Sequence, residues 1–543
     1  MSGVANLIIA PVVLPLVAGA GMLLLSGERH RNIMAAVNVA VTFALACIAI
    51  ALLKMSDAGQ TGISQVYRIG DWPAPFGIVL VLDRLSALML LLTSTLALAA
   101  VVFSLARWHR AGAHFHPLFQ FLLMGLNGAF LTGDLFNLFV FFELLLAASY
   151  GLLLHGSGLA RVKAGLHYIV VNLVASLLFL IGVSLIYGVT GTLNMADLAA
   201  RVPIIAAENR GLLEAGAGIL AMAFLLKAGM WPLCFWLPTT YAAASPPVAS
   251  IFAIMTKVGV YIVLRLSLLL FGDGAGASAG FGSSWLLFGG LATIVFGAIG
   301  TLASQDTARL AAFSVLVSSG TVLAATGMGQ TGVTGGALFY LVSSTLGISA
   351  FFLLVELIER GREPGADMIA VTREAYGEDD DADQGEEEVG MAIVATMGLL
   401  GVAFIGCALV IAGLPPLSGF IAKFALLTAV LHPSEIHRTG AIPGSGWAIL
   451  VILISSGFAT LVAMTRAGIR SFWASPDRTV PRVRVIEMAP VMFLLILCAA
   501  QTVQAGPVMR FMQATAQSLH ASGGYIRDVL ETSGHSTRKA GGI

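Results

Sequence analysis

Charged residues are scarce in this sequence, at 11% of its 543 positions, whereas hydrophobic residues make up 58%. A soluble globular domain has about a quarter of its residues charged. The shortage therefore excludes a soluble globular protein. Because the apolar runs fill nearly the whole length, it also excludes a soluble domain with one anchor. Lys and Arg number 29, as do Asp and Glu, so no excess of basic charge points to nucleic-acid binding.

Cysteine is also rare, and the chemistry that often depends on it is missing. The four cysteines lie far apart in apolar stretches, which favours small core residues over disulfides or metal ligands. They are Cys47, Cys234, Cys407 and Cys498. The sequence also lacks a Gly-rich phosphate loop, a His/Cys metal cluster and a nucleophile with a neighbouring base. It therefore gives no reason to expect an enzyme, a metal site or a cofactor.

Long apolar runs are what the sequence has instead. A membrane helix needs about 20 apolar residues, and about fourteen runs meet this requirement. The first run has no basic residue before it and no small-residue cleavage site, so we expect a retained helix and not a signal peptide. The candidate spans are 6–25, 33–53, 84–106, 116–131, 135–154, 164–187, 211–237, 246–270, 285–304, 309–327, 335–358, 391–430, 446–468 and 487–505.

Basic residues favour one side of the membrane. One alternate set of loops, beginning with 26–32, holds fifteen Lys and Arg residues, and the other set holds six. The positive-inside rule places the richer set in the cytoplasm and both termini on the opposite side. One predicted cytoplasmic loop, 359–390, contains nine carboxylates between Arg373 and Glu388. We interpret it as a disordered, solvated linker, and the alternative is a segment that attracts cations or a basic partner.

Two of the predicted helices are interrupted by proline. Pro232 lies inside the seventh run, and Pro415 and Pro416 lie inside the twelfth. Proline removes a backbone donor and disturbs the turn before it. Both interruptions fall in the pattern A-G-x-x-P-L, at 228–233 and 412–417. Paired breaks of this kind predict two structural repeats, each with a transport site at its break.

Four ionisable side chains fall well inside the predicted spans, namely Glu143, Lys227, Lys257 and Lys423. Glu143 lies about eight residues from the start of its helix, or about 12 Å of depth, too far for its side chain to reach water. Burial raises the proton affinity of a carboxylate and a nearby ammonium lowers it, so Glu143 can load and release a proton with Lys227 as its partner. We interpret the four residues as a proton path.

Purely structural roles for these residues stay open as alternatives to a proton path. A fixed ion pair that locks helices together is the alternative for Glu143 and Lys227. Lys423 follows a helix break, and it could be a snorkelling residue that caps a half-helix. His167, near the start of the sixth span, is either a secondary relay site or a core histidine.

The stretches around these residues resemble a known family. "LFNLFVFFELLL" (135–146), the segment 225–266 and "AGLPPLSGFIAKF" (412–424) resemble the antiporter-like subunits shared by Mrp cation/proton antiporters and respiratory complex I. Within that superfamily, "YRIGDWPAPFGIVLVLDRLSALM" (67–89) and "YGVTGTLNMADLA" (187–199) are most similar to the D-type component of the Mrp antiporter, also called Pha or Mnh.

The resemblance implies an all-α polytopic membrane protein of fourteen helices, with two inverted five-helix repeats and broken seventh and twelfth helices. It divides the chain into N-terminal helices (1–115), a first repeat (116–270), a second repeat (285–468) and a last helix with a C-terminal tail (487–543). The family's ionisable residues on its fifth, seventh, eighth and twelfth helices fall on Glu143, Lys227, Lys257 and Lys423.

Two features depart from the family pattern. The acidic run looks like an insertion in a cytoplasmic loop. Ser343 and Ser344 stand where several complex I relatives carry His or Lys, so the resemblance does not carry a proton relay through this helix.

The implied function is the proton-translocating subunit of a Na⁺(K⁺)/H⁺ antiporter, in which proton movement is coupled to cation export. The implied setting is the bacterial plasma (inner) membrane, with subunits of the A, B, C, E, F and G types as partners. One alternative is a proton-pumping subunit of complex I or of a membrane-bound hydrogenase, powered by redox chemistry elsewhere. Another is a structural scaffold subunit that conducts nothing itself.

Overall fold

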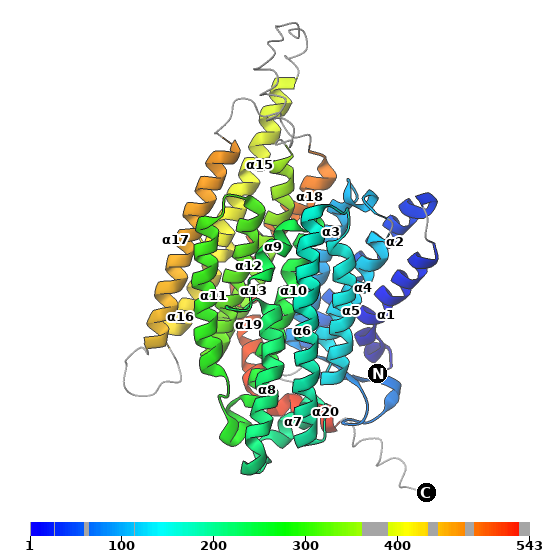
Figure 1. Ribbon diagram of the computed structural model, residues 1–543, viewed down its shortest axis with the longest axis vertical. Coiled ribbons are helices and arrows are strands. Elements are labelled where there is room, and N and C mark those ends of the chain that lie inside the picture. Colours follow the sequence, from blue (N-terminus) through cyan, green and yellow to red (C-terminus); the bar gives the residue numbers. More distant parts are fainter. Residues whose placement is uncertain are drawn as a thin grey trace.

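Helices long enough to cross a membrane make up most of the chain in the computed structural model (Figure 1). The structure describes residues 2–25, 28–58, 64–112, 114–360, 389–432, 444–472 and 483–531. Thirteen helices of this described part are apolar and long enough to span a bilayer. The shorter apolar helix α4 (Phe115–Leu131) lies among them and accounts for the fourteenth predicted span. The predicted fold class, an all-helical membrane protein, is confirmed.

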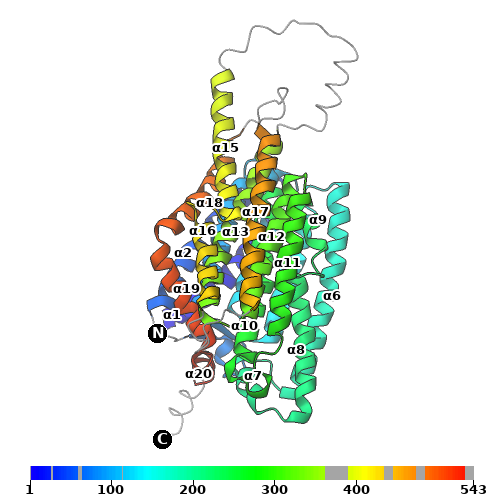
Figure 2. The same cartoon turned by 90° about the vertical axis from the view of Figure 1, so that its left-hand side faces the viewer.

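The other spanning helices follow the predicted order. They are α1 (Ser2–Leu24), α2 (Arg31–Ala58), α3 (Arg84–Ser104), α5 (Leu135–Leu153), α6 (Leu159–Thr190), α8 (Ala207–Ala228), α10 (Pro246–Phe271), α11 (Ser283–Ala303), α12 (Thr307–Gly327), α13 (Thr331–Glu359), α15 (Val389–Ala412), α17 (Gly444–Phe472) and α18 (Val485–Val503). In Figure 2 most of these helices run along the long axis of the molecule. The most apolar windows of α10 and α13 are completely buried, whereas only 33% and 28% of the residues in those of α1 and α2 are buried. The core of the bundle therefore lies around α10 and α13.

Two helices are broken where the sequence predicts it. α8 ends at Ala228 and the short α9 (Trp236–Ala243) begins after Pro232; α15 ends at Ala412 and α16 (Ser418–Leu431) begins after Pro416. Each first half ends at a glycine with a left-handed backbone, Gly229 (φ 71°) or Gly413 (φ 77°). At both breaks the amide of the residue after the glycine donates to the carbonyl five residues earlier, at 2.9 Å. This is the helix-ending geometry that glycine permits.

The order of the helices along the chain agrees with the two predicted repeats. α4 to α10 fall within the first predicted repeat and α11 to α17 within the second. The domain boundaries, and the inverted relation of the repeats, stay predictions.

A β-hairpin and three short helices add to the predicted picture. β1 (Gln65–Arg68) pairs antiparallel with β2 (Val79–Leu82), from Gln65 opposite Leu82 to Arg68 opposite Val79. Branched apolar residues favour a strand, and all four residues of β2 are buried. The remaining helices are α7 (Met195–Arg201), α19 (Ala505–His520) and α20 (Gly523–Glu531). α20 contacts both α7 and β1, so the C-terminal helices fold back onto the bundle.

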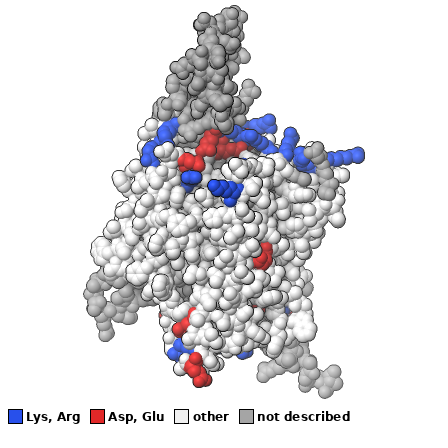
Figure 3. Space-filling view, viewed as in Figure 1, with Lys and Arg blue, Asp and Glu red and all other residues white. Residues whose placement is uncertain are grey.

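Charged side chains mark the two ends of the molecule. In Figure 3, Lys and Arg gather at the upper end with some Asp and Glu, a wide band that is uncharged apart from one acidic patch follows, and a few charges of both signs lie at the lower end. Near the upper end Arg360 pairs with Glu356 (2.7 Å) and with Glu487 of α18 (2.6 Å). Residues 361–388, which hold the predicted acidic run, lie outside the described residues.

Candidate functional site

Glu143 lies in the middle of α5 and is partly exposed. The helix starts sharply because the Asp134 side chain accepts the amides of Phe136 and Asn137, each at 2.9 Å, which is the usual role of an N-cap residue. Glu143 accepts a hydrogen bond from the hydroxyl of Ser176 on α6. The carboxylate therefore has a polar partner inside an apolar helix pair.

Lys227 lies in the last turn of α8, beside the first helix break, and is only 1% exposed. Its ammonium donates to Asn172 Oδ1 at 2.8 Å and to the Tyr168 hydroxyl at 3.4 Å. It also lies 5.2 Å from the centre of the Phe142 ring, a distance at which a cation is attracted to the ring face. A buried ammonium needs such partners, because a bare charge in this environment is costly.

Glu143 and Lys227 are linked through α6 and not by direct contact. No hydrogen bond or ion pair joins the two side chains in the described part of the chain. Ser176 holds Glu143 and Asn172 holds Lys227, and residues four apart lie on the same face of a helix. One turn of α6 therefore separates the two charged groups.

Lys257 is buried in α10, which has an unbroken helix around it. It is 1% exposed, and its ammonium donates to Ser318 at 2.7 Å and to Ser319 at 3.2 Å, both on α12. Ser318 shares a hydrogen bond of 2.7 Å with Ser344 of α13. Hydroxyl groups thus extend from Lys257 into the centre of the bundle.

Lys423 lies in α16, just after the second break, and is 8% exposed. Its ammonium donates to the carbonyl of Ala412 at 2.7 Å, the last residue of α15. Carbonyls at a helix end have no partner inside the helix, so the break itself supplies the acceptor. This contact matches the capping alternative and does not exclude a relay role.

Ser343 and Ser344 of α13, the two serines that depart from the family pattern, bond to the helix that contacts Lys257 and to the helix that contains Lys423. Ser344 joins Ser318 beside Lys257, and its neighbour Ser343 shares a 2.7 Å hydrogen bond with Ser418 at the start of α16. Hydroxyls both donate and accept hydrogen bonds. The resemblance alone does not carry a relay through this helix, because His or Lys is missing, but the two serines bond to α12 and to α16.

His167 does not join this arrangement. Its side chain is exposed on α6, whereas the next residue, Tyr168, is buried and faces Lys227. The secondary relay role of His167 therefore stays a prediction, because no hydrogen bond to the His167 side chain is found within the described part of the chain.

Several polar partners were missed at the sequence level. They are Tyr168, Asn172, Ser176, Ser318, Ser319 and Ser418. A signal existed on α6, where Tyr168, Asn172 and Ser176 recur every fourth residue in an apolar run, which puts them on one helix face. The serines of α12 had no such signal, because many Ser and Thr side chains in membrane helices bond only to their own backbone.

Comparison with known proteins gives this arrangement a context. The model of the family described as "NADH:quinone oxidoreductase/Mrp antiporter, TM" matches residues 132–443. The D component of a probable K⁺/H⁺ antiporter of Rhizobium meliloti is 61% identical over 518 residues, covering 95% of this chain and 96% of the relative. The D component of a Na⁺/H⁺ antiporter of Alkalihalophilus pseudofirmus is 31% identical over 532 residues, covering 97% and 99%.

Solved structures give a matching picture. A chain in the structure of the Mrp complex from a Dietzia species aligns with a TM-score of 0.82 at 26% identity, covering 98% of this chain and 100% of that one. A chain of respiratory complex I from Thermus thermophilus aligns with a TM-score of 0.71 at 22% identity, covering 94% and 99%, and shows a shared fold alone.

Proposed function

This chain belongs to the NADH:quinone oxidoreductase/Mrp antiporter family, and within it to the D-type components of Mrp cation/proton antiporters; from this premise we propose that it carries protons through Glu143, Lys227, Lys257 and Lys423. It is a multi-pass membrane protein and part of a multisubunit complex. The observation that carries the proposal is that the three buried lysines and the partly exposed Glu143 all bond to side chains or carbonyls of the apolar helices.

The first step uses the two charges joined through α6. The two opposite charges attract each other, so a change in the charge of one group changes the electrostatic energy of the other. Ser176 and Asn172 hold the two groups one helical turn apart. A proton that arrives on Glu143 therefore favours release of the proton on Lys227.

The second step passes through hydroxyl groups. Lys257 donates to Ser318, Ser318 bonds to Ser344, and the neighbouring Ser343 bonds to Ser418 in the helix of Lys423. Hydroxyls carry no charge at neutral pH but can order water and pass protons by exchanging donor and acceptor roles. These two hydroxyl pairs, which no hydrogen bond in the described residues joins to each other or to Lys423, support a relay between Lys257 and Lys423 in place of the His or Lys of complex I relatives.

We propose that this proton movement drives export of a monovalent cation by the assembled complex. The two relatives named above are called K⁺/H⁺ and Na⁺/H⁺ antiporter components, so both ions are candidates. The A, B, C, E, F and G types of subunit are the proposed partners. The relatives' names favour this role over the complex I and hydrogenase alternatives. We further propose an inner-membrane orientation with both termini on the periplasmic side, as the loop charges indicate.

Replacing Glu143 by Gln in the assembled complex tests the proposal. Gln keeps the size and hydrogen bonding but cannot ionise, so exchange should fall to background while the protein stays in the membrane. Cation-dependent proton movement in inverted vesicles, scaled to complex abundance, is the measurement. Glu208→Gln, at an exposed carboxylate in the first turn of α8, is the matched control and should exchange normally. Normal exchange by Glu143→Gln would contradict the proton-carrier role and favour a structural scaffold role for this chain.

A further inference from the structure

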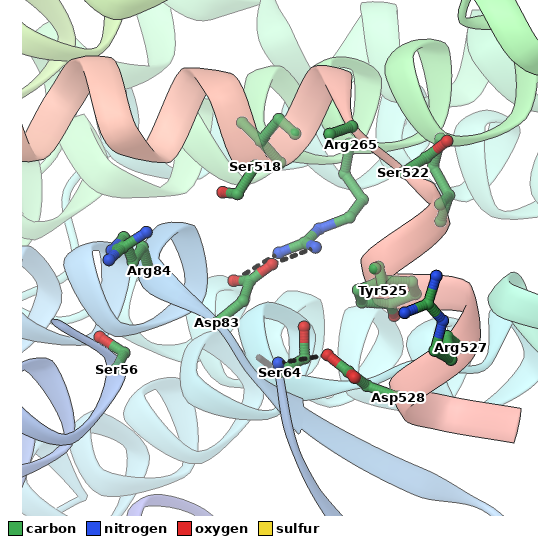
Figure 4. Close-up of a pocket in the computed structure, with 14 residues that line it drawn as sticks. Ser56, Ser64, Asp83, Arg84, Arg265, Ser518, Ser522, Tyr525, Arg527 and Asp528 are labelled. Carbon is green, nitrogen blue, oxygen red and sulfur yellow. Dashed lines mark hydrogen bonds and ion pairs between the residues drawn. The ribbon is translucent and has the colours of Figure 1, made fainter. Parts of the chain in front are cut away.

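A polar pocket lies at the end of the molecule where the C-terminal helices fold back (Figure 4). None of the four residues of the proposed proton path lines it. It has a volume of about 260 Å³ and is lined by residues of α2, α3, α10, α19 and α20 and by Ser64 before β1. Because one water molecule occupies about 30 Å³ of liquid, the pocket has room for several. Its position at the end of α10 sets it below Lys257, on the side that we propose to be periplasmic.

A bidentate ion pair forms the inner wall of this pocket. Arg265 of α10 donates to the two carboxylate oxygens of Asp83 at 2.5 and 2.9 Å, and the Tyr525 ring of α20 lies 5.4 Å from its guanidinium. Burial would raise the pKa of Asp83, but the Arg265 charge and the hydrogen bonds from Arg265 and Ser86 outweigh it and hold that pKa below its ordinary value. Asp83 therefore stays ionised, and the inner wall of the pocket is charged.

The ion pair continues a line of polar residues along α10. Arg265 donates to the Tyr261 hydroxyl at 3.0 Å, and Tyr261 donates to the Phe130 carbonyl at 2.7 Å. Lys257, Tyr261 and Arg265 follow one another at four-residue spacing, which keeps them near one helix face over about 12 Å. No hydrogen bond in the described residues joins Lys257 to Tyr261, so a proton path between them would require a bridging water.

The outer part of the pocket is polar enough to hold water, and the guanidiniums of Arg84 and Arg527 line it together with the carboxylate of Asp528. Asp528 of α20 accepts the Ser64 amide at 2.6 Å, and burial raises the pKa of Asp528 above its ordinary value. Hydroxyls of Ser56, Ser518 and Ser522 also line this part. Figure 4 shows Asp528 and the Asp83–Arg265 pair facing the same space.

We propose that this pocket is the water-filled mouth through which the proton path at Lys257 meets the periplasmic solution. The ligand is water and the protons that it carries. The inference rests on the proposed function, since a mouth requires a path behind it. The C-terminal helices then have a direct part in transport, because α19 and α20 form the outer wall.

A cysteine in the pocket tests the proposal in the assembled complex. Ser522 is partly exposed and lines the pocket, so Ser522→Cys can be labelled with membrane-impermeant methanethiosulfonates that carry either a positive or a negative charge. The background is Cys47→Ser, since the other three native cysteines are buried. Ala279→Cys is the control, because Ala279 is exposed in the loop after α10 and does not line the pocket.

The two labels should shift the periplasmic-pH profile of exchange in opposite directions. A positive adduct lowers the local proton concentration and moves the profile to lower pH, and a negative adduct moves it to higher pH. A unit charge about 7 Å from the path in water gives a shift of about 0.4 pH unit. Labelled Ala279→Cys should show no shift.

Other outcomes overturn the proposal. Complete labelling without a shift, or an equal loss of exchange with both labels, means that the pocket is structural only. A shift in the half-saturating cation concentration without one in the pH profile means that the pocket serves the cation. Labelling only from the cytoplasmic side refutes a periplasmic mouth. If Glu143→Gln abolishes exchange but these labels have no effect, the relay stands and opens elsewhere; if Glu143→Gln exchanges normally, the relay itself fails.

Discussion

At the scale of single residues, the central issue is whether Glu143 and Lys227 are a working pair or a fixed one. The two side chains are held by Ser176 and Asn172 and do not touch. A fixed pair gains its energy from direct contact between the charges. The observed separation leaves each group a neutral partner in both protonation states, as a proton carrier requires.

This difference predicts the behaviour of a double mutant. Glu143→Ala and Lys227→Ala should each abolish exchange with little loss of protein, and the double mutant should stay inactive at similar abundance. Breaking a fixed buried pair would instead cost about 3–5 kcal/mol in each single mutant, and the double mutant would regain abundance. Exchange and protein level in inverted vesicles distinguish the two. Glu143→Asp is the conservative variant, and it should keep part of the activity because its carboxyl remains.

The serines of α13 lead to a second residue-scale prediction. Ser344→Ala removes the hydroxyl that bonds to Ser318 beside Lys257, so exchange should fall several-fold without loss of protein. Ser349→Ala is a matched control on the same helix, because Ser349 is also buried and shares a hydrogen bond with Ser250 but lies outside the proposed relay. Equal activity in the two variants would refute a relay through α13.

The four ionisable residues could be found from the sequence, whereas among their partners only the polar residues of α6 left a signal in it. A charge inside an apolar run is visible in one dimension, because its cost in lipid does not depend on the fold. The contact between Lys257 and Ser318 joins residues far apart in the chain, and nothing local distinguishes Ser318 from other membrane serines. The partnership expected between Glu143 and Lys227 stays a prediction, and the residues of α6 that hold the two side chains, Ser176 and Asn172, belong to another helix.

At the scale of elements, the two helix breaks were predictable and the smaller elements were not. Gly and Pro in the pattern A-G-x-x-P-L act locally, so the ends of α8 and α15 follow from sequence. The β-hairpin, α7, α19 and α20 depend on packing at the end of the bundle. The hairpin is two-stranded, and such a unit is stable only against other structure.

The second break leads to a prediction at this scale. Gly413 has a left-handed φ of 77°, and a Cβ there would lie 2.5 Å from Cδ of Lys423. Gly413→Ala should therefore cost about 1–2 kcal/mol in backbone strain and displace Lys423 from the Ala412 carbonyl. We expect a lower melting temperature of the purified complex and several-fold slower exchange. Gly401→Ala is the control on the same helix, since a Cβ at Gly401 meets nothing within 4 Å. Normal stability and exchange in Gly413→Ala would show that the break tolerates a side chain.

At the scale of the whole molecule, the last prediction concerns what this chain does alone. The proton path has clear candidates, but a monovalent cation is held by several converging oxygens, and the sequence shows no such cage. Among the described residues, no group of three or more His, Cys, Asp or Glu side chains is placed to hold a metal ion. We therefore expect no sodium- or potassium-dependent proton movement from this chain alone in vesicles, and full activity when the neighbouring subunits are expressed with it. The control is membrane insertion, because the isolated chain must be present in the membrane at the level found in the complex. Clear exchange by the inserted chain alone would mean that both ions cross within it, and the cation route would then have to be sought between its own helices.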